Sequence, residues 1–223
     1  CDTSLFCALH QHREQFSDSE KMQMAVDVGS AMEYLHSLQP AIIHRDLKSH
    51  NVLRAKDGRL KVCDFGLVHV RNPQAGTPAY MAPELAVRSR RSQYDNRVDV
   101  FSFALIVWSL WTRSKPYEEE RFATMSLFHL TEAVCAGERP SIPEDCPAYL
   151  SLLLRDCWHA SAQLRPSFQQ ILARLDEALV TSSLGMMAGG EGGEGSQPRP
   201  RSRSMFRGLR EAIDAITSGT LDK

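Results

Sequence analysis

The segment that most constrains the fold spans residues 44–51 and reads HRDLKSHN. It carries acidic, basic and amide side chains and little apolar surface to bury, so it is predicted to be a loop held by ordered elements on both sides. Upstream, Ser17 and Glu20 have the spacing of a capping box, which predicts the start of a helix. Apolar residues follow at helical intervals before Pro40, namely Ala25, Val28, Met32 and Leu35.

Residues 51–63, NVLRAKDGRLKVC, follow the polar segment with two β-prone runs around Asp57-Gly58. This pattern predicts a tight hairpin in which Gly58 adopts a positive φ. The polar segment therefore connects a helix to a hairpin. A loop fixed in this way is a common place for functional side chains.

The remainder of the chain is typical of a mainly α protein. The apolar run 98–111 is shorter than the ~20 residues that cross a bilayer, so it predicts a buried helix and no membrane span. Further helices are predicted at 149–158 and 168–179. With the hairpin, these elements define one folded unit over residues 1–182.

The composition changes after the last predicted helix. Residues 185–204 are dominated by Gly, Glu, Pro, Arg and Ser, so a disordered linker is predicted over 183–204. Residues 205–217 are predicted to form a short amphipathic helix, with Phe206, Leu209, Ile213 and Ile216 on one side. This helix either packs on the body of the protein or docks in a groove of a partner.

Charge and cysteine content exclude some classes of partner. The chain has 223 residues with 26 basic and 27 acidic side chains, a formal net charge of -1, so no global field recruits nucleic acid or an anionic membrane. The six cysteines are scattered without a C-x-x-C pair, which favours reduced thiols and a cytoplasmic location.

Two further motifs follow HRDLKSHN, with DFG at 64–66 and APE at 82–84. Ordinary loop polarity could produce one of the three, but not all three in this order. Together they resemble the C-terminal lobe of a protein kinase, over roughly residues 3–180. The resemblance implies a mainly α lobe with a small hairpin near the active site, which transfers the γ-phosphoryl group of ATP to a protein substrate.

The resemblance also implies roles for four catalytic residues. Asp46 would orient the substrate hydroxyl and accept its proton. Asn51 and Asp64 would be the Mg²⁺ ligands, since oxygen donors suit this hard cation. Lys48 would place a point charge near the transferred phosphoryl group. Lys48, Asn51 and Asp64 are thus the expected contacts to Mg²⁺ and ATP.

Other positions match supporting residues of the family. His44 and Phe65 resemble the pair of rings that sets the orientation of DFG, which ends at Gly66. Glu84 resembles a carboxylate that pairs with a distant arginine, expected here at Arg165. Asp99 resembles the acid that holds the backbone of the catalytic loop, although an acid favoured by a helix N-terminus is the alternative.

The substrate class is indicated by two conflicting features. Lys48 and the GTPAY segment at 76–80 resemble serine/threonine kinases, with Thr77 expected to bond Asp46 and Lys48. The segment 156–168, DCWHASAQLRPSF, resembles tyrosine kinases. This mixture is similar to the tyrosine-kinase-like group, such as mixed-lineage and Raf-type kinases, which act on Ser and Thr.

Two features depart from the family pattern. No Gly-rich loop or strand lysine precedes the catalytic loop, because the first glycine is Gly29 and the only earlier lysine is Lys21. We therefore expect the N-terminal lobe to be missing from this chain, and the chain alone to be inactive. The alternative is a truncated kinase-like scaffold that binds partners and transfers no phosphate.

The second departure is the segment 67–75, LVHVRNPQA, which contains no Ser, Thr or Tyr. In many kinases a phosphate in this region meets the arginine of the HRD motif. We predict that this segment is not switched by phosphorylation and that Arg45 bonds locally instead.

Overall fold

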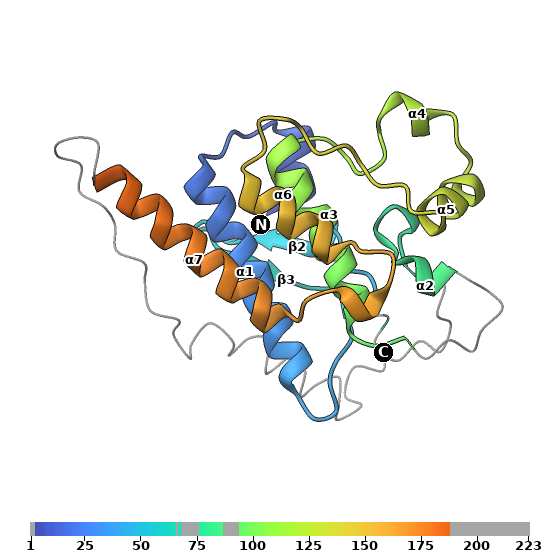
Figure 1. Ribbon diagram of the computed structural model, residues 1–223, viewed down its shortest axis with the longest axis horizontal. Helices are drawn as coiled ribbons and strands as arrows, with labels where there is room; N and C mark the ends of the chain where they lie inside the picture. The colour runs from blue at the N-terminus through green and yellow to red at the C-terminus, as the bar shows by residue number, and fades with distance from the viewer. Residues whose placement is uncertain (1–2, 66, 68–75, 87–93, 188–223) are drawn as a thin grey trace. The chain divides into compact units, whose positions relative to one another are not determined.

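The computed structural model describes residues 3–65, 67, 76–86 and 94–187 (Figure 1). The chain divides into two compact units, residues 1–183 and 184–223, and nearly all described residues belong to the first. The helices and strands of the described residues follow in the order β1 (Thr3–Ser4), η1 (Cys7–Gln11), α1 (Asp18–Ser37), η2 (Ser49–Asn51), β2 (Val52–Arg54), β3 (Leu60–Val62), η3 (Pro78–Tyr80), α2 (Pro83–Ala86), α3 (Arg97–Thr112), α4 (Glu120–Ala123), α5 (Leu127–Cys135), α6 (Ala148–Cys157), η4 (Ala162–Leu164) and α7 (Phe168–Met187).

The predicted capping box begins α1. The Ser17 Oγ accepts a hydrogen bond from the Glu20 backbone N–H, and the Glu20 carboxylate accepts one from the Ser17 backbone N–H. Both bonds satisfy N–H groups at the helix start, because these groups have no partner within the helix. The helix ends at Ser37, shortly before Pro40.

The predicted hairpin is formed by β2 and β3, which pair antiparallel with Val52 opposite Val62. Gly58 in the turn has a φ of +83°, as expected for a glycine at this place in a hairpin. A third strand, β1, was not predicted and lies beside β2. A strand of two residues is too short to show an alternating pattern.

The core centres on α3. Its residues from Val98 to Leu110 are all buried, as expected for a helix that is apolar on every side. α1 and α6 both pack against it, and Figure 1 shows α1 and α7 running side by side in the same unit. Among the described residues, no helix is long and apolar enough to span a bilayer.

A buried acid joins α1 to the hairpin. Asp27 is 1% exposed, and its carboxylate accepts bonds from the Leu60 N–H at 2.9 Å and the Arg59 guanidinium at 2.9 Å. Because the polar loop 44–51 lies between these two elements in the chain, these bonds fix the spacing of the elements that hold the loop. The helical spacing of apolar residues in α1 does not predict this contact.

The helix α7 runs to Met187, beyond the end predicted at residue 179 and into the range expected to be a linker. Most of that range, and all of 205–217, lie outside the described residues, so the predicted boundary near 182 stays a prediction.

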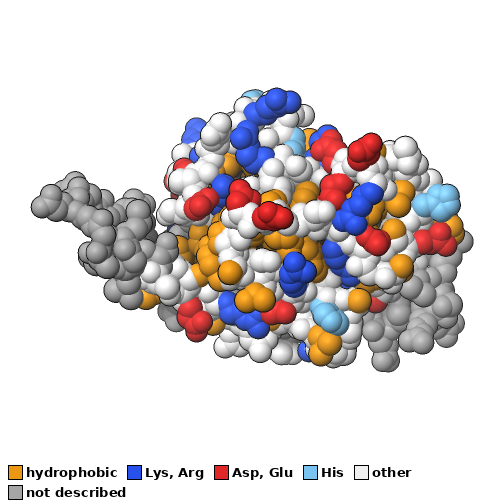
Figure 2. All heavy atoms as spheres, turned by 45° about the horizontal axis from the view of Figure 1, so that its top comes forward, with side chains coloured by type: hydrophobic (Ala, Val, Ile, Leu, Met, Phe, Trp, Pro, Cys, Tyr) orange, Lys and Arg blue, Asp and Glu red, His pale blue; other side chains and the backbone are white. Residues whose placement is uncertain are grey.

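Figure 2 shows acidic and basic side chains interspersed on one face of the molecule.

Candidate active site

A buried carboxylate holds the backbone at the start of the loop 44–51, called the catalytic loop below. Asp99, in the first turn of α3, is 0% exposed and accepts bonds from the backbone N–H groups of His44 and Arg45, both at 2.8 Å. The His36 Nε2 lies 2.9 Å from the same carboxylate. The position also suits an acid at a helix N-terminus, but the dipole alone does not explain two bonds to the loop.

These bonds stabilise an unusual backbone conformation. Arg45 has a φ of +65°, in the left-handed region that non-glycine residues seldom adopt. Such a conformation costs about 1–3 kcal/mol and persists where neighbouring contacts impose it. The two hydrogen bonds that Asp99 accepts therefore hold this backbone conformation in the loop immediately before Asp46.

Three of the predicted residues converge on the Asp46 carboxylate. Its Oδ2 accepts bonds from the Lys48 ammonium at 2.7 Å and the Asn51 amide at 3.2 Å. Its Oδ1 accepts from the Thr77 backbone N–H at 3.0 Å and hydroxyl at 2.9 Å. The Lys48 ammonium also donates to the Thr77 hydroxyl at 2.8 Å, so Thr77 contacts both residues as expected.

The orientation of Asn51 leaves one atom for a ligand. Its amide nitrogen donates to the Asp46 backbone carbonyl at 2.9 Å as well as to the carboxylate, so the amide oxygen is directed elsewhere. The Asn51 backbone carbonyl accepts the Cys63 N–H at 2.9 Å, which places Asp64 one residue from this contact. Asp64 is exposed and has a φ of +64°.

The donor set fits a hard divalent cation. An amide oxygen and a carboxylate are ligands that Mg²⁺ accepts, and Mg²⁺ usually takes only one or two protein ligands, with water and phosphate oxygens completing its shell. In the part of the chain that the structure describes, no cluster of three or more His, Cys, Asp or Glu could hold a metal. A nucleotide phosphate would have to complete the coordination.

The predicted contact between His44 and Phe65 is present, with ring centroids 5.2 Å apart. The buried His44 ring also bonds the Cys63 carbonyl through Nε2 at 3.0 Å. The catalytic loop is thereby joined to the residues around Asp64. Gly66 and residues 68–75 lie outside the described residues, so the prediction about that segment stays a prediction.

The predicted ion pair between Glu84 and Arg165 is also present and is bidentate, with N–O distances of 2.6 and 2.8 Å. Arg165 is 3% exposed and further donates to the carbonyls of Arg97 and His159. This arginine connects α2, the start of α3 and the segment before α7.

Arg45 differs in part from its expected local bonding. Its guanidinium donates to the Tyr94 hydroxyl at 3.1 Å, and the two residues are separated by 49 positions. The bond stays within the protein, as expected, but it is not local in sequence.

Several residues that support the site were not predicted from the sequence. The Ser49 hydroxyl lies 3.0 Å from the Tyr80 hydroxyl, and the Tyr80 carbonyl accepts from Ser102 on α3. Burial raises the pKa of Tyr80, which keeps the phenol protonated. His36 was missed too, since a histidine late in a helix shows no pattern that marks its partner.

The structure thus brings Asp46, Lys48, Asn51 and Thr77 together on a mainly helical unit, with Asp64 one residue from the Cys63–Asn51 contact. The sequence pattern of the family described as protein tyrosine and serine/threonine kinase matches residues 2–175. The chain therefore belongs to this protein kinase family.

Similar proteins carry kinase names. The chain is 37% identical over 193 residues to the RGS domain-containing serine/threonine-protein kinase A of Dictyostelium discoideum, covering 83% of this chain and 16% of that protein. It is 34% identical over 191 residues to the dual specificity protein kinase shkC of the same organism, covering 81% and 36%. It is 36% identical over 180 residues to the probable serine/threonine-protein kinase SIS8 of Arabidopsis thaliana, covering 77% and 17%.

Proposed function

We propose that this chain is the catalytic C-terminal lobe of a serine/threonine protein kinase of the tyrosine-kinase-like group, which transfers the γ-phosphoryl group of ATP to a protein hydroxyl. The observation that carries the proposal is the convergence of Lys48, Asn51 and Thr77 on the Asp46 carboxylate. The chain spans 36% or less of the curated relatives described above. The activity of the whole protein is therefore part of the proposal.

Asp46 orients the acceptor hydroxyl and takes its proton. Its carboxylate is held on both oxygens, so it presents a fixed direction to an incoming substrate. A base placed in this way contributes about 10²–10⁴-fold in rate. Because phosphoryl transfer depends mainly on positioning and charge stabilisation, the fixed direction matters as much as the basicity.

The Lys48 side chain donates hydrogen bonds to two residues of the site. Its ammonium contacts both Asp46 and Thr77, at 2.7 and 2.8 Å, so its position is set from two elements. In the reaction it would place positive charge beside the transferred phosphoryl group. Thr77 links this charge to the segment that follows DFG.

Asn51 and Asp64 would hold Mg²⁺ through the amide oxygen and the carboxylate. When bound, the cation neutralises charge that develops on the phosphate oxygens. The chain's own contribution is to direct the Asn51 oxygen, because its amide nitrogen is committed to Asp46. In this family a Gly-rich loop and a strand lysine contact ATP, and the sequence before Asp46 contains neither feature. We therefore expect the chain alone to be inactive.

Serine/threonine specificity is supported by Thr77 and Lys48, whose mutual bond matches the role expected for serine/threonine kinases. Several relatives are named as serine/threonine or dual specificity kinases.

The described cysteines are all free thiols, which supports a cytoplasmic location.

The test is phosphorylation of Ser-, Thr- and Tyr-containing peptides by the longest natural protein that includes this chain, with Mg²⁺ and ATP. We expect transfer to Ser and Thr, and a loss of at least about 10²-fold in the Asp46→Asn variant. Exposed Glu132→Gln on α5 is the matched control and should retain full activity. Equal signals from the wild type and Asp46→Asn would instead favour a non-catalytic binding module.

A further inference from the structure

Arg45 is held at its backbone and at its side chain by the segment that leads into α3. This segment, residues 94–99, is called the entry segment below. Asp99 accepts the Arg45 backbone N–H at 2.8 Å, and the Tyr94 hydroxyl accepts a bond from the Arg45 guanidinium at 3.1 Å. Both contacts therefore act on the residue immediately before Asp46, and they come from positions five residues apart.

Arg45 is also closely confined. It is 6% exposed, and its φ of +65° is one that non-glycine residues seldom adopt. Its carbonyl oxygen faces Gly76, where an added Cβ would lie only 3.0 Å from that oxygen. Gly76 itself has a φ of +141°, a conformation that favours glycine. Because packed interiors transmit strain, a displacement of the Arg45 side chain is passed to its own backbone and so to Asp46.

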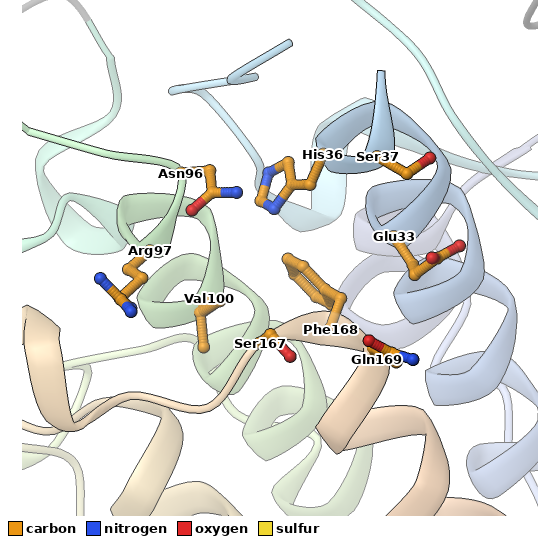
Figure 3. Close-up of a pocket in the computed structure, with 9 residues that line it drawn as sticks. All are labelled: Glu33, His36, Ser37, Asn96, Arg97, Val100, Ser167, Phe168 and Gln169. Atoms are coloured by element: carbon orange, nitrogen blue, oxygen red, sulfur yellow. The ribbon is translucent and has the colours of Figure 1, made fainter. Parts of the chain in front are cut away.

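The entry segment gives Tyr94 a fixed base. The Asp95 carboxylate accepts the Arg97 backbone N–H at 2.9 Å and the Arg97 guanidinium at 2.7 Å. The Arg97 carbonyl in turn accepts a bond from the buried Arg165 at 3.0 Å. Arg97 also lines a pocket between α1, α3 and α7, and Figure 3 shows it at the start of α3. Tyr94 is thus carried by a segment that has its own contacts to the body of the protein.

We propose that Tyr94 is a positioning residue for phosphoryl transfer, which acts through Arg45 on the direction of the Asp46 carboxylate. This inference rests on the function proposed for Asp46. Tyr94 is not among the described side chains that bond this carboxylate, so its effect on the reaction is indirect. A hydrogen bond from a charged guanidinium is stronger than one between neutral groups. The fold itself therefore supplies a firm contact to the arginine of the HRD motif.

The first experiment compares the kinetics of Tyr94→Phe and the wild type, in the longest natural protein that includes this chain. Tyr94→Phe keeps the ring and removes only the hydroxyl that Arg45 contacts. We expect kcat with a Ser peptide to fall about 3- to 10-fold, the rate equivalent of one ordinary hydrogen bond. KM for ATP and for the peptide should change by less than about twofold, because a change in positioning alone lowers kcat and kcat/KM equally.

A double-mutant cycle separates positioning through Arg45 from a general loss of stability. In an Arg45→Met background, Tyr94→Phe should reduce kcat no further, because the group through which Tyr94 acts is gone. Tyr149→Phe on α6, at a position 41% exposed, is the matched control for the loss of a phenol hydroxyl and should keep the wild-type kcat. An unchanged melting temperature of Tyr94→Phe is the folding control.

Hydrogen exchange gives a second measurement, which does not depend on phosphoryl transfer. If Tyr94 helps to hold the catalytic loop, its loss should make local opening of the loop easier. We expect the backbone amides of residues 44–51 to exchange about 3- to 10-fold faster in Tyr94→Phe than in the wild type. Exchange in α6 should be the same in both proteins, and Tyr149→Phe should leave the exchange of the catalytic loop unchanged.

An unchanged kcat in Tyr94→Phe, or a further loss of kcat when Tyr94→Phe is added to Arg45→Met, overturns the proposal. Unchanged exchange of the catalytic loop in Tyr94→Phe overturns it as well. The Asp46→Asn variant separates this failure from a failure of the proposed function. If Asp46→Asn is inactive while Tyr94→Phe is fully active, the proposed function stands and only the positioning role fails. If Asp46→Asn is as active as the wild type, the proposed function itself fails.

Discussion

At the scale of single residues, the site depends on which atom of each polar side chain is already engaged. Asn51 uses its amide nitrogen within the loop and so presents oxygen to a cation. Cys63, beside Asp64, donates its thiol to the Asn51 carbonyl, and burial raises the pKa of this thiol. The raised pKa favours a packing role for the Cys63 thiol over a nucleophilic one.

The hydroxyl of Thr77 gives the sharpest prediction at this scale. Thr77→Val keeps the shape of the side chain but removes the two bonds of the hydroxyl, to Asp46 and Lys48, and leaves the backbone N–H bond to Asp46 in place. Because hydrogen bonds to charged groups contribute about 1.5–3 kcal/mol, we expect kcat/KM to fall about 10- to 100-fold. The measurement is steady-state kinetics of the longest natural protein that includes this chain, with a Ser peptide.

Thr77→Ser is the control, since it retains the hydroxyl and should keep most of the activity. If Thr77→Val and Thr77→Ser had the same kcat/KM, the hydroxyl would have no part in positioning Asp46.

At the scale of elements, different contacts hold the catalytic loop and the elements on either side of it. α1 is begun by the capping box at Ser17 and joined to β3 through Asp27. The loop itself is held from α3 by Asp99. Local sequence patterns predicted α1, the hairpin and α3, because each depends on neighbours within a few positions.

The capping box predicts a measurable contribution to stability. Ser17→Ala should lower the free energy of unfolding by about 0.5–2 kcal/mol, because the Glu20 N–H loses its acceptor. Chemical denaturation at neutral pH measures the change. Ser114→Ala, at an exposed position outside any helix, is the control and should change little.

The same box predicts a pH dependence. Hydrogen bonds from the backbone and side chain of Ser17 hold the pKa of Glu20 below its usual value. A carboxyl with a lowered pKa in the folded state stabilises the protein above its unfolded pKa and loses this contribution as pH falls through the folded pKa. The difference in stability between wild type and Ser17→Ala should therefore shrink on acidification below about pH 4.3. A difference that stays constant down to pH 3 would rule out this linkage.

At the scale of the whole molecule, one ion pair connects segments that are far apart in the chain. Arg165 bonds Glu84 across 81 positions and is 3% exposed. Arg165→Met should lower the free energy of unfolding by about 3–5 kcal/mol, because it leaves Glu84 without this guanidinium in a partly buried place.

A double-mutant cycle with Glu84→Gln tests whether the pair acts as a unit. The double variant should be less destabilised than the sum of the two single changes. Additive effects would show that the two side chains stabilise the fold independently.

The sequence by itself determined the long helices and the hairpin, and it singled out the residues proposed for the site. The capping box, the Asp57-Gly58 turn and the three motifs are local, and each is read from residues close together in the chain. They also identified Asp46, Lys48, Asn51 and Thr77, whose contacts are present. These local patterns could not predict the orientation of the Asn51 amide or the hydrogen bond between Arg45 and Tyr94.

Only the tertiary structure decided the contacts that hold these local elements together. Asp27 with Leu60, His36 with Asp99 and Ser49 with Tyr80 pair residues 33, 63 and 31 positions apart. No periodicity records such pairs, because they depend on how helices pack after their apolar faces are buried. The pocket between α1, α3 and α7 arises for the same reason, since it exists only once three helix ends have met.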